Sequence, residues 1–276
     1  MRITIPFIKA QAARNDFLMS WSEMLPDGVD RPRLAQELCD RHSGIGADGW
    51  YVLSKTDEAD VAATLYNADG SVSELSGNGS RCVAALLYEA GRSTEEPVSI
   101  RTGAGLKTIR VLSSDGGLRL EMAMGTAPIT GKETLEVLGD SRDAVILTVG
   151  NPQCAVPVSD FDFNWRAVGA ALERHSRFAN RTNVSFLRRM ADKHHIEVRI
   201  WERGVGETES SGTGCTGAAA AARFLGWVES PVEVQTAAGP LDVRWNGDEY
   251  FLTGPAEVVA RGEFYASLES GGSSAR

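Results

Sequence analysis

The sequence of 276 residues lacks the features that mark several large classes of protein. Its four cysteines are scattered, with no CxxC pair and no Cys/His cluster, which argues against a disulfide scaffold and a metal site. No run of Lys and Arg exceeds a pair and the formal charge is −9, so a nucleic-acid-binding surface is not expected. No apolar run approaches the roughly 20 residues that cross a bilayer, and the N-terminal segment does not resemble a signal peptide. We therefore expect a cytoplasmic protein with no metal and no nucleic-acid or membrane partner.

Strand-like segments dominate what is present. Apolar residues make up 42% of the chain, enough to fill a sizeable core. Alternating or β-branched runs predict strands at residues 1–8, 61–66, 98–102, 106–112, 118–124, 144–149, 184–187, 196–201, 232–235, 241–245 and 250–252. Helical patterns occur at residues 33–41, 80–90, 165–173 and 215–225. Long strand-rich stretches with a few separated helices, rather than strict βαβ alternation, predict an α+β fold.

Two of the predicted helices begin in the same way. Ser76-Gly77-Asn78-Gly79 and Ser211-Gly212-Thr213-Gly214 each precede a helix of small apolar residues, and the two serines are 135 residues apart. This similarity predicts two similar halves, residues 1–125 with 262–276 and residues 126–261, each with a buried helix. A helix N-terminus has unpaired N–H groups and a partial positive charge, so each loop is suited to bind a carboxylate or phosphate. Neither loop contains the Gly-Lys-Ser/Thr of a phosphate-binding P-loop.

Motifs along essentially the whole chain resemble those of the diaminopimelate epimerase family. Two long stretches carry most of the resemblance, residues 67–71 with 76–82 and residues 202–208 with 211–214. Shorter motifs follow in the family's order: Asn15-Asp16-Phe17, residues 41–49, Gly150-Asn151-Pro152, residues 181–184 and Thr253-Gly254-Pro255. The resemblance implies two pseudo-symmetric halves, each a curved, mostly antiparallel sheet around a central helix, with the active site in the cleft between them. It also implies a cofactor-independent isomerase of lysine biosynthesis, a cytoplasmic homodimer that converts LL-diaminopimelate to the meso form.

The resemblance also assigns substrate-binding residues. The carboxylate of the reacting amino acid is assigned to Gly77, Asn78, Gly79, Gly212 and Thr213. The remaining substrate contacts, mostly to the distal amino and carboxylate groups, are assigned to Asn15, Asn67, Asn151, Asn183, Glu202 and Arg203. In the family two cysteines, one before each Gly-X-Gly, remove and return the α-proton from opposite sides.

Both of those positions are serine here, Ser76 and Ser211. A free thiol has a pKa of roughly 8.5, whereas an alcohol is a much weaker acid. If the gap is about five units, forming the alkoxide costs on the order of 7 kcal/mol more, a rate penalty near 10⁵ unless another base assists. Gln153 stands where the family usually has histidine, and it cannot carry a proton. Glu207, the carboxylate nearest in sequence to Ser211, is our reserve candidate for a general base.

Three interpretations remain open. The first is an amino acid epimerase or racemase for LL-diaminopimelate or a related amino acid, with Ser76 and Ser211 at the acid/base positions. These serines are natural and assisted by Glu207 or Glu202, or they replace cysteines of the working enzyme. The second is a carboxylate-driven isomerase or cyclase of the same fold without thiol chemistry, like the phenazine-pathway isomerases. The third is a homologue that binds amino acids without catalysis.

Overall fold

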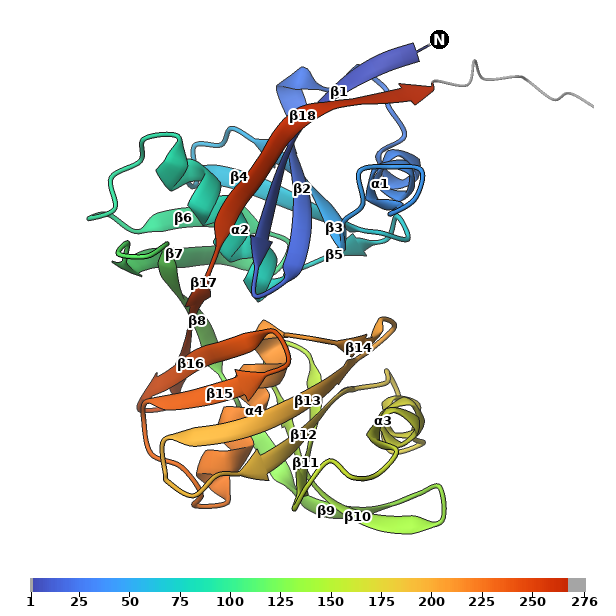
Figure 1. Ribbon diagram of the computed structural model, residues 1–276, viewed down its shortest axis with the longest axis vertical. Helices are drawn as coiled ribbons and strands as arrows, with labels where there is room; N and C mark the ends of the chain where they lie inside the picture. Colours follow the sequence, from blue (N-terminus) through green and yellow to red (C-terminus); the bar gives the residue numbers. More distant parts are fainter. Residues whose placement is uncertain (1, 268–276) are drawn as a thin grey trace, which may run out of the picture. The chain divides into compact units, whose positions relative to one another are not determined.

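The computed structural model describes residues 2–267 and divides into two compact units (Figure 1). Unit 1 consists of the described residues up to Leu118 and from Ala256 onward, and unit 2 is Arg119–Pro255. The sequence had placed these divisions after residues 125 and 261. They fall earlier because β8 (Arg119–Thr126) pairs with a strand of unit 2, whereas β18 (Glu257–Ser267) pairs with the first strand of unit 1.

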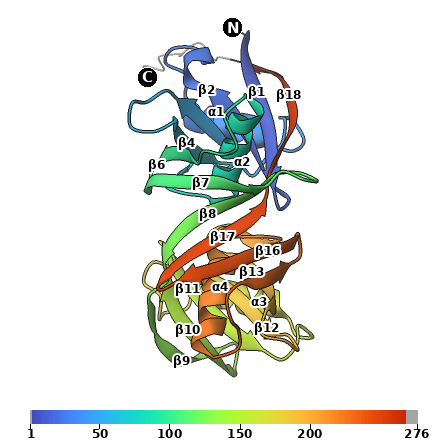
Figure 2. The ribbon, with the colours of Figure 1, turned by 90° about the vertical axis from the view of Figure 1, so that its left-hand side faces the viewer.

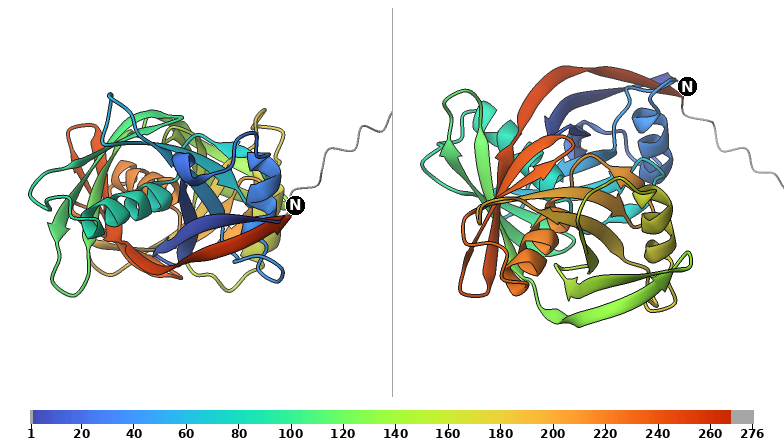
Figure 3. Two further views of the ribbon diagram at one scale, coloured as in Figure 1. Left: turned by 90° about the horizontal axis from the view of Figure 1, so that it is seen from above. Right: turned by 60° about the horizontal axis from the view of Figure 1, so that its bottom comes forward.

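Unit 1 is a mixed sheet of mostly antiparallel strands. Its order runs from β18 through β1 (Arg2–Ala12), β2 (Asn15–Trp21), β3 (Gly49–Ser54), β4 (Val61–Asn67) and β6 (Val98–Thr102) to β7 (Gly105–Ser113). The short β5 (Val72–Ser73) extends the edge of β4 that β6 also uses. Only β2–β3 and β4–β6 are parallel. Figure 3 shows β1 and β18 running side by side.

Unit 2 repeats this order of strands. It runs from β9 (Ile129–Val137) through β10 (Asp140–Thr148), β11 (Pro152–Val158), β12 (Asn183–Arg189), β13 (His195–Glu202) and β15 (Val232–Thr236) to β16 (Gly239–Asn246), β17 (Glu249–Pro255) and β8. The short β14 (Gly206–Thr208) pairs with β13, as β5 pairs with β4. The parallel pairs, β11–β12 and β13–β15, occupy the same places in the order as those of unit 1. The predicted similarity of the two halves is therefore present in the topology.

A buried helix packs against the sheet of each unit. In unit 1 it is α2 (Gly77–Glu89), which contacts β1, β2 and β18, and in unit 2 it is α4 (Gly212–Phe224), which contacts β10, β11 and β12 (Figure 2). The alanines at positions 218–222 are fully buried, because methyl side chains let the α4 backbone approach the sheet closely. The helix ends at the C-cap Leu225, and Gly226 follows with a φ of +71°, as expected for glycine just beyond a C-cap. Both helices are buried, as predicted.

An outer helix completes the core of each unit. In unit 1, α1 (Arg31–Cys39) begins at the N-cap Asp30 and packs its apolar face against Trp50 and Val52 of β3. In unit 2, α3 (Trp165–Glu173) packs against Phe186 of β12. Among residues 2–267, no helix has the length and apolar character needed to span a membrane.

Candidate active site

The half-site of unit 1 is built on the first turn of α2. Ser76 is the N-cap, and its Oγ accepts a hydrogen bond from the backbone N–H of Gly79 at 3.1 Å. Because a hydroxyl both donates and accepts, Ser76 keeps its own hydrogen for another acceptor. A Cβ at Gly79 would lie 2.4 Å from the phenol oxygen of Tyr51, so glycine is required for α2 to approach β3 this closely. Burial raises the pKa of Tyr51, which keeps it a neutral phenol beside the backbone of Ser76.

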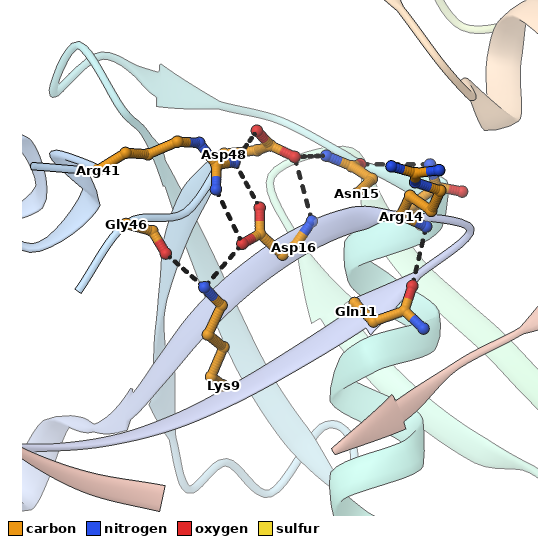
Figure 4. Close-up of polar contacts among 9 residues, drawn as sticks. Lys9, Gln11, Arg14, Asn15, Asp16, Arg41, Gly46 and Asp48 are labelled. Carbon is orange, nitrogen blue, oxygen red and sulfur yellow. Dashed lines mark hydrogen bonds and ion pairs between the residues drawn. The ribbon is translucent and has the colours of Figure 1, made fainter. Parts of the chain in front are cut away.

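Asn78, the second residue of α2, is joined to the β1–β2 hairpin by amide contacts. Its Nδ2 donates to Asn15 Oδ1 at 3.2 Å, while its Oδ1 accepts from the buried Arg81 at 2.7 Å. Asn15 Nδ2 in turn donates to Asp48 Oδ2 at 2.5 Å, as Figure 4 shows. The structure therefore brings together Asn15 and Asn78, two of the predicted binding residues. Asn67 makes a different contact, because its Nδ2 donates to Ser71 Oγ at 2.9 Å.

Four charged side chains stabilise this part of unit 1. Arg41 donates to both carboxylate oxygens of Asp16, at 2.7 and 3.2 Å, and to Asp48 at 2.8 Å (Figure 4). Lys9 contacts Asp16 at 2.9 Å and also donates to the carbonyl of Gly46 at 2.7 Å. Burial acts to raise the pKa of Asp16, but the hydrogen bonds from Arg41 and Lys9 outweigh it and lower the pKa. The cluster pairs two cations with two anions and fixes the loop that precedes β3 to the β1–β2 hairpin.

The tip of that hairpin has a strained backbone. Ala12 pairs with Asn15, so only Ala13 and Arg14 form the turn, and their φ values are +49° and +63°. A two-residue turn of this kind requires positive φ at both central positions, which favours Asn and Gly. Alanine and arginine are both disfavoured there by contact between Cβ and the backbone. The chain thus holds two strained residues directly before Asn15.

The half-site of unit 2 has the same construction around α4. Ser211 is the N-cap, and its Oγ accepts from the backbone N–H of Gly214 at 3.2 Å. Ser211 is only 4% exposed, so its hydroxyl is more deeply buried than the half-buried Ser76. Ser185 Oγ donates to the carbonyl of Gly214 at 3.3 Å, which links the first turn of α4 to β12. Each predicted acid/base serine is therefore an N-cap whose oxygen faces the first-turn N–H groups of its helix.

Two amide side chains reach the first turn of α4 from the start of β11. Gln153 Nε2 donates to Asn151 Oδ1 at 2.7 Å, and Asn151 Nδ2 donates to Thr213 Oγ1 at 3.5 Å. Gln153 is 2% exposed, whereas Asn151 and Thr213 are half-buried. The predicted binding residues Asn151 and Thr213 are thus in contact.

Asn183 connects three segments of unit 2. Its Nδ2 donates to the carbonyl of Pro152 at 3.2 Å, and its Oδ1 accepts from the backbone N–H of Arg203 at 2.9 Å. The Arg203 guanidinium donates to the carbonyl of Asn180 at 3.1 Å. Asn183 therefore stabilises the turn at the end of β13, where Glu202 and Arg203 lie.

A buried carboxylate, which the sequence did not reveal, supports the same turn. Glu173 is 3% exposed and accepts hydrogen bonds from Trp201 Nε1 and from the backbone N–H of Gly204, both at 3.0 Å. It also lies 3.4 Å from the guanidinium of Arg181. Burial acts to raise the pKa of Glu173, but these donors and nearby arginines lower it, so the group is an anion in the folded protein.

Glu207, the reserve candidate for a general base, is held by an arginine. Arg166 donates to its two carboxylate oxygens at 2.5 and 2.7 Å, and the Glu207 side chain is 42% exposed. Both of its carboxylate oxygens are thus occupied by one guanidinium, in a two-point contact that fixes the side chain. This contact favours a structural role for Glu207 over proton transfer.

All four cysteines lie in the described part of the chain, are buried and form no disulfide. Burial raises the pKa of Cys39, Cys82 and Cys154 to about 12, so these thiols stay protonated near neutral pH. All three side chains lie in the core of their unit. None of these three can supply the thiolate that the positions of Ser76 and Ser211 lack.

Comparison with known proteins identifies the family. The model of the family described as "Diaminopimelate epimerase" matches residues 8–130 and 145–259. The chain belongs to the diaminopimelate epimerase family. It is 35% identical to the diaminopimelate epimerase of Pelotomaculum thermopropionicum over 276 aligned residues, which cover 94% of this chain and 98% of that protein. The corresponding enzyme of Moorella thermoacetica is 34% identical with the same coverage.

Solved structures share the fold at lower identity. A probable proline racemase from Agrobacterium radiobacter K84 superposes with a TM-score of 0.75 and 15% identity, over 98% of this chain and 94% of that one. A Bacillus anthracis phenazine biosynthesis protein of the PhzF family gives a TM-score of 0.72 and 17% identity, over 96% and 100%. At these identities the likeness shows the fold alone. The predicted α+β epimerase fold is confirmed.

Family membership could be predicted from local motifs, but several supporting residues could not. Tyr51, Glu173 and Arg166 give no local signal, because their partners at the site are 25 to 41 positions away in the chain. Gln153 was singled out only as a departure from the family. Its spacing of two residues from Asn151, which stands just before β11, is the sequence signal that could have indicated a supporting role.

Proposed function

We propose that this protein is a cofactor-independent epimerase for an amino acid with a distal polar group, LL-diaminopimelate or a close relative. The observation that carries the proposal is the pair of capped helices in a member of the diaminopimelate epimerase family. Each unit presents a Ser-Gly-X-Gly turn whose serine oxygen caps the helix. Orphan N–H groups at these turns suit the substrate α-carboxylate, and Ser76 and Ser211 stand where the proton-carrying groups are expected.

The chemistry of serine sets the expected rate. An N-cap oxygen that accepts a backbone N–H is stabilised as an anion by the helix N-terminus, which eases alkoxide formation. One serine, as the alkoxide, takes the α-proton, while the hydroxyl of the other serine gives its hydrogen to the carbon from the opposite side. The step that limits the reaction is loss of a proton from the first serine to solvent, because an alcohol is a far weaker acid than a thiol. We therefore propose slow epimerisation by Ser76 and Ser211, with Asn15, Asn67, Asn151, Asn183, Glu202 and Arg203 contributing to recognition of the substrate.

The experiment is hydrogen exchange at the α-carbon in D₂O with LL-diaminopimelate. The wild type is compared with Ser76→Cys/Ser211→Cys, and the exposed substitution Ser114→Cys controls for a thiol elsewhere on the protein. The double variant should incorporate α-deuterium faster, by up to about 10⁵-fold if the two groups differ by five pKa units. Ser114→Cys should match the wild type. If neither the wild type nor the double variant exchanges the α-hydrogen of any amino acid with a distal amino or carboxylate group, the proposal is wrong.

One observation favours a second candidate, amino acid binding without turnover. Both serine-capped glycine turns are present, yet three cysteines remain protonated and Glu207 is held by Arg166. Calorimetry decides between the two candidates. Tight binding of LL-diaminopimelate without deuterium incorporation by the wild type supports the binding protein, whereas any turnover excludes it. The ion pair of Glu207 weighs against the carboxylate-driven alternative through this residue.

We further propose that the protein works as a cytoplasmic homodimer on a small molecule. The acidic composition, with a formal charge of −9, supports a small-molecule substrate over nucleic acid. Sedimentation equilibrium measures the oligomeric state directly, and a monomer at micromolar concentration would contradict the dimer.

A further inference from the structure

A chain of three polar side chains leads from the core of unit 2 to the first turn of α4. Gln153 lies on β11 and is 2% exposed, Asn151 stands just before that strand, and Thr213 is the second residue of α4. The contacts run from Gln153 Nε2 to Asn151 Oδ1 at 2.7 Å and from Asn151 Nδ2 to Thr213 Oγ1 at 3.5 Å. None of the three side chains carries a charge.

The direction of these hydrogen bonds determines what the Thr213 hydroxyl can do. Because Gln153 donates to Asn151 Oδ1, the amide of Asn151 must turn its Nδ2 toward Thr213. Thr213 Oγ1 is then an acceptor on the protein side, and its own hydrogen has to be donated elsewhere. The first turn of a helix is where a bound carboxylate receives such donors.

The position of Gln153 lowers the stability of the folded protein. Its Oε1 is buried and makes no hydrogen bond, and a Cβ on Gly217 would lie 3.5 Å from that oxygen. A buried polar group without a partner is destabilising, and residues of this kind are concentrated where function requires them. An apolar side chain of similar size at position 153 would pack against α4 equally well and would leave no buried acceptor without a hydrogen bond.

We infer that Gln153 is a positioning residue, which acts through Asn151 to aim the Thr213 hydroxyl hydrogen at the substrate carboxylate. The inference rests on the proposed function, because it deepens the description of the same half-site. An amide does not titrate, so this arrangement keeps one direction of donation without depending on a protonation state. The 3.5 Å contact is long, and hydrogen bonds of this type commonly shorten when substrate is bound.

A double-mutant cycle tests the inference. The dissociation constant of LL-diaminopimelate is measured by calorimetry for the wild type, Gln153→Met, Thr213→Val and the double variant. We expect Gln153→Met to weaken binding about tenfold in the wild-type background and to have no further effect when Thr213 is already Val. An equal loss in both backgrounds would show that Gln153 acts by packing and would overturn the inference.

A second variant tests the direction of donation. Gln153→Glu keeps the size of the side chain. At pH 9 its ionised carboxylate can only accept hydrogen bonds, so the amide of Asn151 has to turn its Nδ2 toward that carboxylate and its Oδ1 toward Thr213. The Thr213 hydroxyl then has to donate to Asn151 Oδ1. We expect Gln153→Glu to bind the ligand as weakly as Gln153→Met at that pH. Binding equal to the wild type would mean that the relay runs in the opposite direction, which contradicts the inference.

A measurement without ligand separates this inference from the proposed function. In spectra of protein labelled with ¹⁵N at Asn, the side-chain amide signals of Asn151 should shift in Gln153→Met and stay unchanged in Gln235→Met, a control in the same unit. Unchanged Asn151 signals in Gln153→Met would refute the relay even if the ligand binds. If the wild type binds no amino acid while these signals shift as expected, the proposed function fails and the contact between Gln153 and Asn151 stands.

Discussion

Arg166 holds the carboxylate of Glu207 through two parallel hydrogen bonds of 2.5 and 2.7 Å. The guanidinium also lies 4.6 Å from the centroid of the Trp165 ring, which restricts it further. This contact attaches β14 to the start of α3 within unit 2. Glu207 is therefore held by α3 and is not a free carboxylate beside Ser211.

We therefore predict that Glu207→Gln changes α-deuterium incorporation less than twofold. Since both side chains are more than one-third exposed, loss of the ion pair should leave the midpoint of urea denaturation nearly unchanged. Exchange in D₂O and urea denaturation measure the two effects. Arg166→Gln, which frees the carboxylate instead, is the matched control. A loss of exchange of 100-fold or more in Glu207→Gln alone would make Glu207 a catalytic residue after all.

The N-cap serines should contribute to stability separately from any chemistry. Ser211→Ala removes the acceptor for the Gly214 N–H and should cost about 1–2 kcal/mol in the free energy of unfolding, whereas Ser211→Gly should cost only a few tenths. Urea denaturation of the two variants side by side gives the comparison. A loss below about 0.3 kcal/mol in Ser211→Ala would mean that the cap hydrogen bond contributes little. Any test of catalysis at Ser211 must use variants that keep the cap.

The strained hairpin gives a prediction of increased stability. Arg14 has a φ of +63°, which glycine adopts without contact between Cβ and the backbone. Arg14→Gly should raise the free energy of unfolding by about 0.5–1 kcal/mol, after allowance for the greater freedom of glycine in the unfolded chain. Arg101→Gly, at an exposed position in β6, should lower it by a similar amount. If both substitutions destabilise equally, the hairpin is not strained in solution.

The cluster around Asp16 predicts a dependence of stability on pH. The folded-state pKa of Asp16 lies below its unfolded value, so its contribution is present above the unfolded pKa of about 3.9 and is lost as the pH falls through the folded value. Asp16→Asn should cost about 2 kcal/mol at pH 7, because it removes charged hydrogen bonds from Arg41 and Lys9.

Urea denaturation of both proteins between pH 2 and 7 measures this effect. The difference between wild type and Asp16→Asn should shrink as the pH falls below 4. Asp57→Asn, an exposed substitution in the same unit, is the control and should leave the curve unchanged. A difference that is constant with pH would assign the loss to packing instead of charge.

Much of the fold could be predicted from sequence, and the omissions have a physical cause. The four helices appear close to their predicted ranges, because capping residues and apolar periodicity are local signals. The strands β2 and β3 were missed because they form a parallel pair whose residues are mostly buried, so the sequence shows no alternation there. β9 and β18 were missed for the opposite reason, since many of their residues are exposed and few are fully buried.

The site divides in a similar way. Ser76, Asn78, Ser211 and Thr213 could be located because glycine motifs at helix starts are contiguous in the sequence. The contacts of Glu173 could not be predicted, because its acceptors face a tryptophan and a backbone amide that belong to distant segments. Sequence motifs indicate where a substrate binds, whereas the residues that hold those motifs in place become evident only in three dimensions.

The pairing of β1 with β18 has a consequence for biosynthesis. Ten residues of the first strand find partners in β18, which is synthesised after all of unit 2, whereas every strand of unit 2 lies within one continuous stretch, residues 119–255. Unit 2 can therefore fold during translation before unit 1 is complete, because the sheet of unit 1 keeps an open edge until β18 has been made. The exposed edge of β1 is the part of the nascent chain that most needs shielding by chaperones during that interval.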